Sequence, residues 1–136
     1  MKKIIIPLLV FGLFGCSTEP VPPENAKDVQ ASSQFLEKPN TTGVTIIRDK
    51  GYVASGCAIT SYINGVRLAE LEPGEKVTAF LPAGQVNVGA GFAGRGLCSG
   101  PPKKEREFII KENSPRVLRI FTDQSGNVDI LQTTIN

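Results

Sequence analysis

The sequence contains no histidine and no tryptophan. Histidine is the side chain that most often moves protons near neutral pH, and it is also the commonest metal ligand. Serine is plentiful, but without histidine only a Ser–Lys pair remains to activate it. No serine is followed three residues later by a lysine, as such a motif requires. We therefore predict a protein that is not an enzyme and that holds no metal or cofactor.

A strong charge of one sign is also missing. The chain has 15 basic and 13 acidic residues, and two of the basic ones, Lys2 and Lys3, stand at its N-terminus. Without this pair the two signs balance at 13 each. Proteins that bind nucleic acid carry clustered lysine and arginine for the phosphates, so no nucleic-acid partner is predicted.

The apolar run at residues 4–14 is too short to span a bilayer. It follows the two lysines and ends at Gly15 and Cys16, which is the layout of a secretory signal peptide. A cysteine directly after the glycine makes this opening resemble a bacterial lipoprotein signal. The resemblance implies cleavage after residue 15 and a lipid on Cys16 that holds the protein to the membrane. With Ser17 in place of aspartate, it also implies the periplasmic face of the outer membrane.

Cys57 and Cys98 are the two remaining cysteines. In a compartment outside the cytoplasm, two such thiols predict a disulfide bond. A zinc site is the weaker alternative, because two cysteines without histidine leave its ligand set incomplete. The bridge would close a loop of about 40 residues and stabilise the fold by about 4 kcal/mol.

The composition divides the chain into three parts. Residues 1–15 are the predicted signal peptide. Residues 16–42 are rich in proline and poor in apolar side chains, which predicts a lipidated N-terminus and a flexible tether. A short helix within residues 26–38 is the alternative for part of it. Residues 43–136 form the predicted domain.

Short apolar runs separated by turn residues fill this domain. Alternation is clear at Val86, Val88, Ala90 and Phe92, which would share one face of a strand. Asn64-Gly65 between two such runs predicts a tight hairpin. The pattern indicates an all-β fold, a single small β-sandwich of seven or eight antiparallel strands, with a small open barrel as the alternative. The expected strands are residues 44–48, 57–63, 66–72, 76–81, 85–92, 105–112, 116–122 and 128–133.

The sequences YINGVRLAEL at residues 62–71 and LPAGQVNV at residues 81–88 resemble the PEGA-type pattern of small prealbumin-like β domains. The longer frame adds TIIRD at residues 45–49, SGC at residues 55–57 and GRGLC at residues 94–98. With these, the chain is similar to uncharacterised bacterial lipoproteins that share a domain of unknown function. The resemblance implies a prealbumin-like fold and an envelope location, and it implies no activity.

The glycine-rich segment at residues 91–102 is the best candidate for a binding loop, because the predicted bridge holds it at Cys98. Arg95 lies between two glycines, where it can pair with a partner's carboxylate or phosphate, or else bond to loop carbonyls. Lys103 and Lys104 are either partner contacts or a solvated strand edge. Tyr52 is the aromatic residue that we expect to be exposed.

Two other stretches resemble ligand motifs. Residues 89–94 match G-x-G-x-x-G, but the residues that follow cannot begin a helix, so no dinucleotide site is predicted. Residues 123–129 resemble a calcium loop, but a hairpin turn at residues 125–127 explains them.

These observations predict a lipid-anchored, non-enzymatic envelope lipoprotein. Its disulfide-stapled loop would bind or scaffold another envelope protein, whose identity does not follow from the sequence. The alternative is a protective inhibitor whose loop blocks the paired carboxylates of a cell-wall hydrolase.

Overall fold

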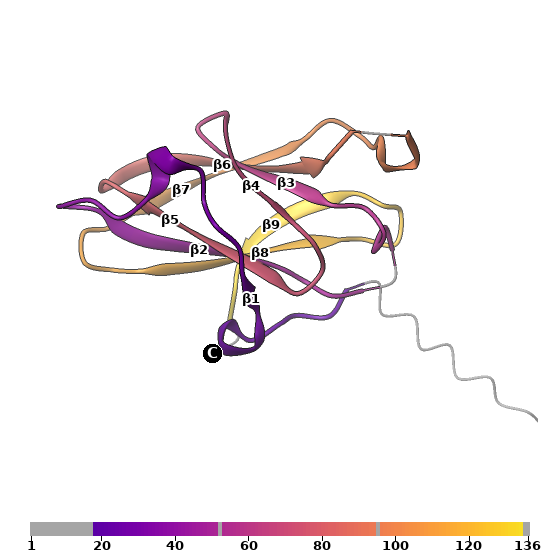
Figure 1. The fold of residues 1–136 in the computed structure, drawn as a ribbon, viewed down its shortest axis with the longest axis horizontal. Coiled ribbons are helices and arrows are strands. Elements are labelled where there is room, and N and C mark those ends of the chain that lie inside the picture. The colour runs from indigo at the N-terminus through magenta and orange to yellow at the C-terminus, as the bar shows by residue number, and fades with distance from the viewer. Residues whose placement is uncertain (1–17, 52, 95, 135–136) are drawn as a thin grey trace, which may run out of the picture.

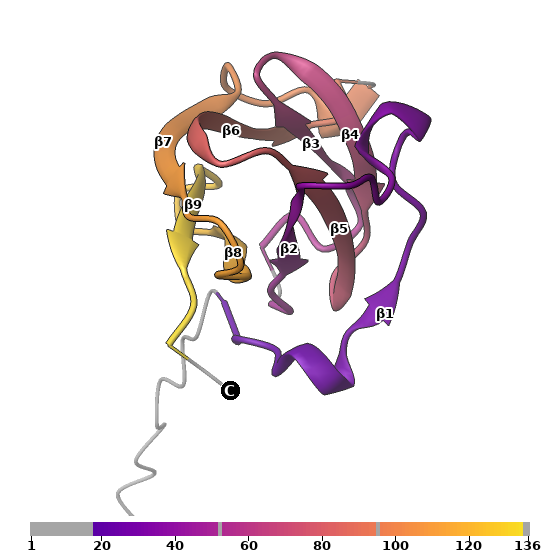
Figure 2. The same ribbon diagram turned by 90° about the vertical axis from the view of Figure 1, so that its left-hand side faces the viewer.

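The structure, a computed structural model, describes residues 18–51, 53–94 and 96–134. The chain forms a two-layer β-sandwich (Figures 1 and 2). One sheet has the order β1-β5-β2-β8-β9 and the other has the order β4-β3-β6-β7. The predicted sandwich is confirmed, and the sheets do not close into a barrel. The elements are η1 (Pro23–Asn25), β1 (Lys27–Asp28), η2 (Ser33–Phe35), β2 (Thr42–Arg48), β3 (Ile59–Ile63), β4 (Val66–Leu71), β5 (Glu75–Leu81), β6 (Gly84–Phe92), η3 (Gly96–Cys98), β7 (Lys104–Ile110), β8 (Arg116–Thr122) and β9 (Val128–Gln132).

Strands β2 to β9 match the strands expected from the sequence, in the same order. The hairpin between β3 and β4 turns at Asn64 and Gly65, whose φ angles are 48° and 78°. Both positive values are those of the turn that asparagine and glycine favour, so this prediction is confirmed. Most neighbouring strands are antiparallel, but β2 runs parallel to β8 and β1 runs parallel to β5.

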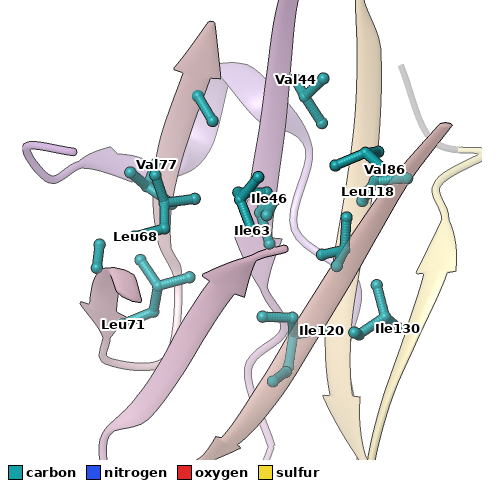
Figure 3. Packing of buried hydrophobic residues seen from close by; sticks show 14 of the residues in the cluster. Val44, Ile46, Ile63, Leu68, Leu71, Val77, Val86, Leu118, Ile120 and Ile130 are labelled. Carbon is teal, nitrogen blue, oxygen red and sulfur yellow. The ribbon is translucent and has the colours of Figure 1, made fainter. Parts of the chain in front are cut away.

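The core lies between the two sheets (Figure 3). Alternate residues of each strand point into it, as the pleat of a strand requires. On β2 these are Val44 and Ile46, and on β8 they are Leu118 and Ile120, all fully buried. The remaining fully buried large side chains of the same cluster are Ile59, Ile63, Leu68, Leu71, Val77, Ile110 and Ile130.

The predicted flexible tether is wrong for its described part, because residues 19–41 pack on the sandwich. We call this segment the strap. Val21 and Ala26 are buried against Ile47, on the outer face of β2, and against Val117 of β8. Further along, Phe35 is 8% exposed and belongs to the main core.

Backbone hydrogen bonds hold the strap in place. Lys27 donates to the carbonyl of Gly74, just before β5, and Val29 donates to that of Lys76 on β5. Ser32 donates to Leu68 on β4 at 2.9 Å. The strap therefore covers the side of the sandwich where β4 and β5 lie (Figure 2). The alternative of a helix at residues 26–38 is also wrong, since this stretch contains only β1 and the single turn η2.

The connections at one end of the sandwich are residues 49–58, 72–74, 93–103 and 123–127, and we call this end the stapled end. The opposite end holds the turns at residues 64–65, 82–83 and 111–115. The strap begins at the stapled end, where Glu19 and Lys50 exchange backbone hydrogen bonds. The described chain thus enters the fold beside the loop that follows β2.

Candidate functional site at the stapled end

A disulfide bond joins two loops that are distant in sequence. Cys57 lies just before β3 and Cys98 lies in η3, at a sequence separation of 41, and their Cα atoms are 5.3 Å apart. The predicted bridge is therefore present. The bridge ties the loop between β6 and β7 to the loop between β2 and β3, where the chain passes into the four-stranded sheet.

The buried guanidinium of Arg48 fixes the first of these loops from inside. Arg48 is 3% exposed and donates to the carbonyls of Cys57 at 2.6 Å, Leu71 at 2.7 Å and Ala54 at 3.1 Å. Because these acceptors lie on different segments, one side chain holds residues 54–57 against the end of β4. Ala54 adopts a φ of 55° in this arrangement, a backbone conformation that residues other than glycine seldom adopt.

Burial lowers the pKa of Arg48 to about 10, and the nearby charges of Glu72 and Glu75 oppose this shift. The guanidinium therefore remains protonated at neutral pH, and all three bonds to carbonyls persist. This residue was not identified from the sequence. The available signal was its position, because Arg48 shares the inward face of β2 with Val44 and Ile46.

Asp49, the next residue, is 5% exposed on the other face and anchors the start of the strap. Its carboxylate accepts hydrogen bonds from Thr18 Oγ1 and forms an ion pair with Arg119 of β8. The guanidinium of Arg119 also lies 5.2 Å from the ring centroid of Phe121. The charged residues at the end of β2 thus serve to join the strap, the loop and both sheets.

The surface of the stapled end includes one large apolar side chain with full exposure, Leu97 in η3. Lys103 follows the loop, with its Nζ 3.4 Å from Glu105 Oε1 and 4.6 Å above the ring of Tyr62. Lys104 is exposed at the start of β7, which is an edge strand. Leu97 was not identified from the sequence, because a single leucine in a glycine-rich loop has no periodic pattern.

The other residues predicted as partner contacts, Arg95 and Tyr52, lie outside the described residues, and so does Cys16. The structure therefore brings together Cys57, Cys98 and Lys103 at one end of the sandwich.

A bidentate ion pair closes the side of the sandwich opposite the strap. Arg106 of β7 bonds to Asp129 of β9, with Nε–Oδ1 and Nη2–Oδ2 distances of 2.6 and 2.8 Å. The hydrogen bond from Arg106 lowers the pKa of Asp129, with smaller help from the charge of Lys104. A hollow of about 370 Å³ beside this pair is lined partly by Pro101, Pro102 and Lys104.

The predicted turn at residues 125–127 is present. Asp123 accepts hydrogen bonds from the backbone of Ser125 and Asn127, each at 2.9 Å, and the bond from Asn127 is the main cause of its lowered pKa. The carboxylate thus closes a turn between β8 and β9. Within the described residues, no group of three or more Asp, Glu, Cys or His side chains could hold a metal ion.

A scan against models of protein families finds no match, and neither does a search of curated proteins. The part of the chain that the structure describes contains no helix long and apolar enough to cross a membrane.

Proposed function

We propose that this protein is a lipid-anchored, non-enzymatic binding or scaffolding module of the bacterial envelope, with the stapled end as its contact surface. The observation that carries the proposal is the pairing of two distant loops by Cys57–Cys98 around an exposed Leu97. A loop that is already ordered loses less conformational entropy when it binds, so this surface is prepared for contact.

The buried charges support a binding role. Arg48 and Asp49 are the buried charged residues of the described chain, and both are engaged by structural partners. A general acid or base needs a pKa near the working pH, whereas that of Arg48 is about 10. Both groups therefore support the structure of the stapled end, and Arg48 is unsuited to proton transfer at neutral pH.

The anchor is supported by the opening of the sequence, where a short apolar run is followed by Gly15 and Cys16. The first test is to express the full chain in its bacterial envelope beside a Cys16→Ala variant. We expect lipid mass on residue 16 of the wild-type protein and its recovery in the membrane fraction. An uncleaved wild-type chain with an unmodified Cys16 would refute the anchor.

The contact surface is tested separately, by crosslinking in the native envelope. Leu97→Glu and Arg95→Glu change the stapled loop, whereas Leu131→Glu changes an exposed leucine on β9 and serves as the matched control. We expect adducts of the wild-type protein to be retained by the control and lost in the loop variants. Identical adducts in all four proteins would show that the loop is only structural.

A further inference from the structure

The strap limits how far the domain can lie from a lipid on Cys16. Thr18 is bonded to the buried Asp49, and Glu19 pairs with Lys50 through Glu19 N–Lys50 O and Lys50 N–Glu19 O distances of 2.5 and 2.9 Å. Two residues of extended chain span at most about 7 Å. A lipid two residues before Thr18 would therefore hold the stapled end close to the bilayer.

The two loops joined by the disulfide are suited to that position. The parts of these loops next to the two cysteines, residues 51–58 and 96–102, contain no charged residue, although 21% of the chain is charged; the charged residues of the loops lie outside these parts. Leu97 projects from the second loop with its side chain fully exposed. At the opposite end, by contrast, the turn at residues 111–115 contains Lys111 and Glu112, both exposed.

We propose that the stapled end lies on the phospholipid bilayer, with Leu97 in the boundary between headgroups and acyl chains. This inference rests on the proposed lipid at Cys16, and it assigns Leu97 to the bilayer in place of the protein contact tested above; the experiment below separates the two. An exposed apolar side chain gains free energy when it enters this boundary, and a protein already anchored loses little further freedom by doing so.

Charge has a minor part in this contact. The connections of the stapled end carry three basic residues, Lys50, Arg95 and Lys103, and three acidic ones, Asp49, Glu72 and Asp123, so their charges balance. Attraction to anionic lipids needs a cluster of basic residues, which this end does not have. The contact should therefore form on uncharged phosphatidylcholine as well as on anionic vesicles.

The absence of tryptophan from the sequence allows a direct test. Leu97→Trp places a single fluorophore at the stapled end, and Ala83→Trp places one at an exposed turn of the opposite end. Both variants are purified with their lipid and reconstituted in phosphatidylcholine vesicles, with or without bromine on the acyl chains. We expect brominated lipid to quench Leu97→Trp at least twofold and to leave Ala83→Trp unchanged.

Three results would overturn the proposal. If both variants float with vesicles but Leu97→Trp is not quenched, the orientation is wrong and the anchor stands. Equal quenching of the two variants would mean that the domain has no fixed orientation. If Leu97→Trp is shielded from aqueous iodide only after envelope proteins are added, the loop binds protein. A preparation that fails to float, with no lipid mass on Cys16, identifies failure of the anchor itself.

Discussion

Phe35 and Leu36 provide a test of whether the strap belongs to the fold. These adjacent residues are both large and apolar, but Phe35 is 8% exposed within the core cluster and Leu36 is 44% exposed. Truncating a buried phenylalanine to alanine typically costs 3–5 kcal/mol, and a site at the edge of a core is at the lower end, about 3 kcal/mol. The Leu36→Ala variant should lose less than about 1 kcal/mol.

The assay is urea unfolding of the chain without residues 1–15, followed by circular dichroism. With a slope of about 2 kcal/mol per M, Phe35→Ala should lower the midpoint by about 1.5 M. The Leu36→Ala midpoint should move by less than about 0.5 M. If residues 19–41 were a free tether, neither substitution would change the midpoint. Equal midpoints for the two variants would therefore refute the packing described for the strap.

Three further predictions concern the stapled end and the ion pair between the sheets. Replacing Cys57 and Cys98 by serine should lower the free energy of unfolding by about 4 kcal/mol, and a reductant should have the same effect on the wild-type protein in urea titrations. A loss below 1 kcal/mol would contradict the proposed stapling. Arg48→Met leaves three carbonyls without their donor and should lower the free energy of unfolding by at least about 2 kcal/mol in the same titration. An unchanged free energy would mean that water replaces the guanidinium. Asp129→Asn breaks the pair with Arg106 and should cost about 0.5–1 kcal/mol at pH 7. The pKa of Asp129 is lowered in the folded state, so the difference in stability between wild type and Asp129→Asn should be present above pH about 3.9. It should vanish as the pH falls through the pKa of Asp129 in the folded protein. A difference that stays constant down to pH 2 would argue against the ion pair as its cause.

The strands could be predicted because their apolar residues alternate and their turns have distinctive residues. Val86, Val88 and Ala90 identify the inward face of β6, and Asn64-Gly65 fixes the hairpin between β3 and β4. These are local signals, so they do not depend on knowing the partner strand. The disulfide was predictable for another reason, because two cysteines remained once Cys16 was assigned to the lipid.

The strap could not be recognised in the same way. Val21, Ala26 and Phe35 are irregularly spaced, and each packs on a different part of the sandwich. Packing of this kind depends on tertiary contacts and leaves no period in the sequence. One indirect signal existed, since Ile47 is an apolar residue on the outer face of β2 and needs a cover.

The contact residues of the stapled end are predicted less completely than the fold. Sequence reasoning selected Arg95 for its position between glycines, but a side chain's exposure depends on how its loop is held. Leu97 became the central residue only when η3 was seen to direct its side chain into solvent. Arg48 was overlooked because an arginine at the end of a strand is usually solvated.

The strap also affects how the domain could be released from the lipid proposed at Cys16. An anchored domain on a free tether is shed by one proteolytic cut in the tether. Here residues 36–40 are the longest exposed run of the segment, and they follow the contacts made by β1, Ser32 and Phe35. A cut at this stretch would leave the strap bound to the domain by hydrogen bonds and buried side chains. Shedding would then require the strap to unfold from the sandwich, and not only cleavage of the chain.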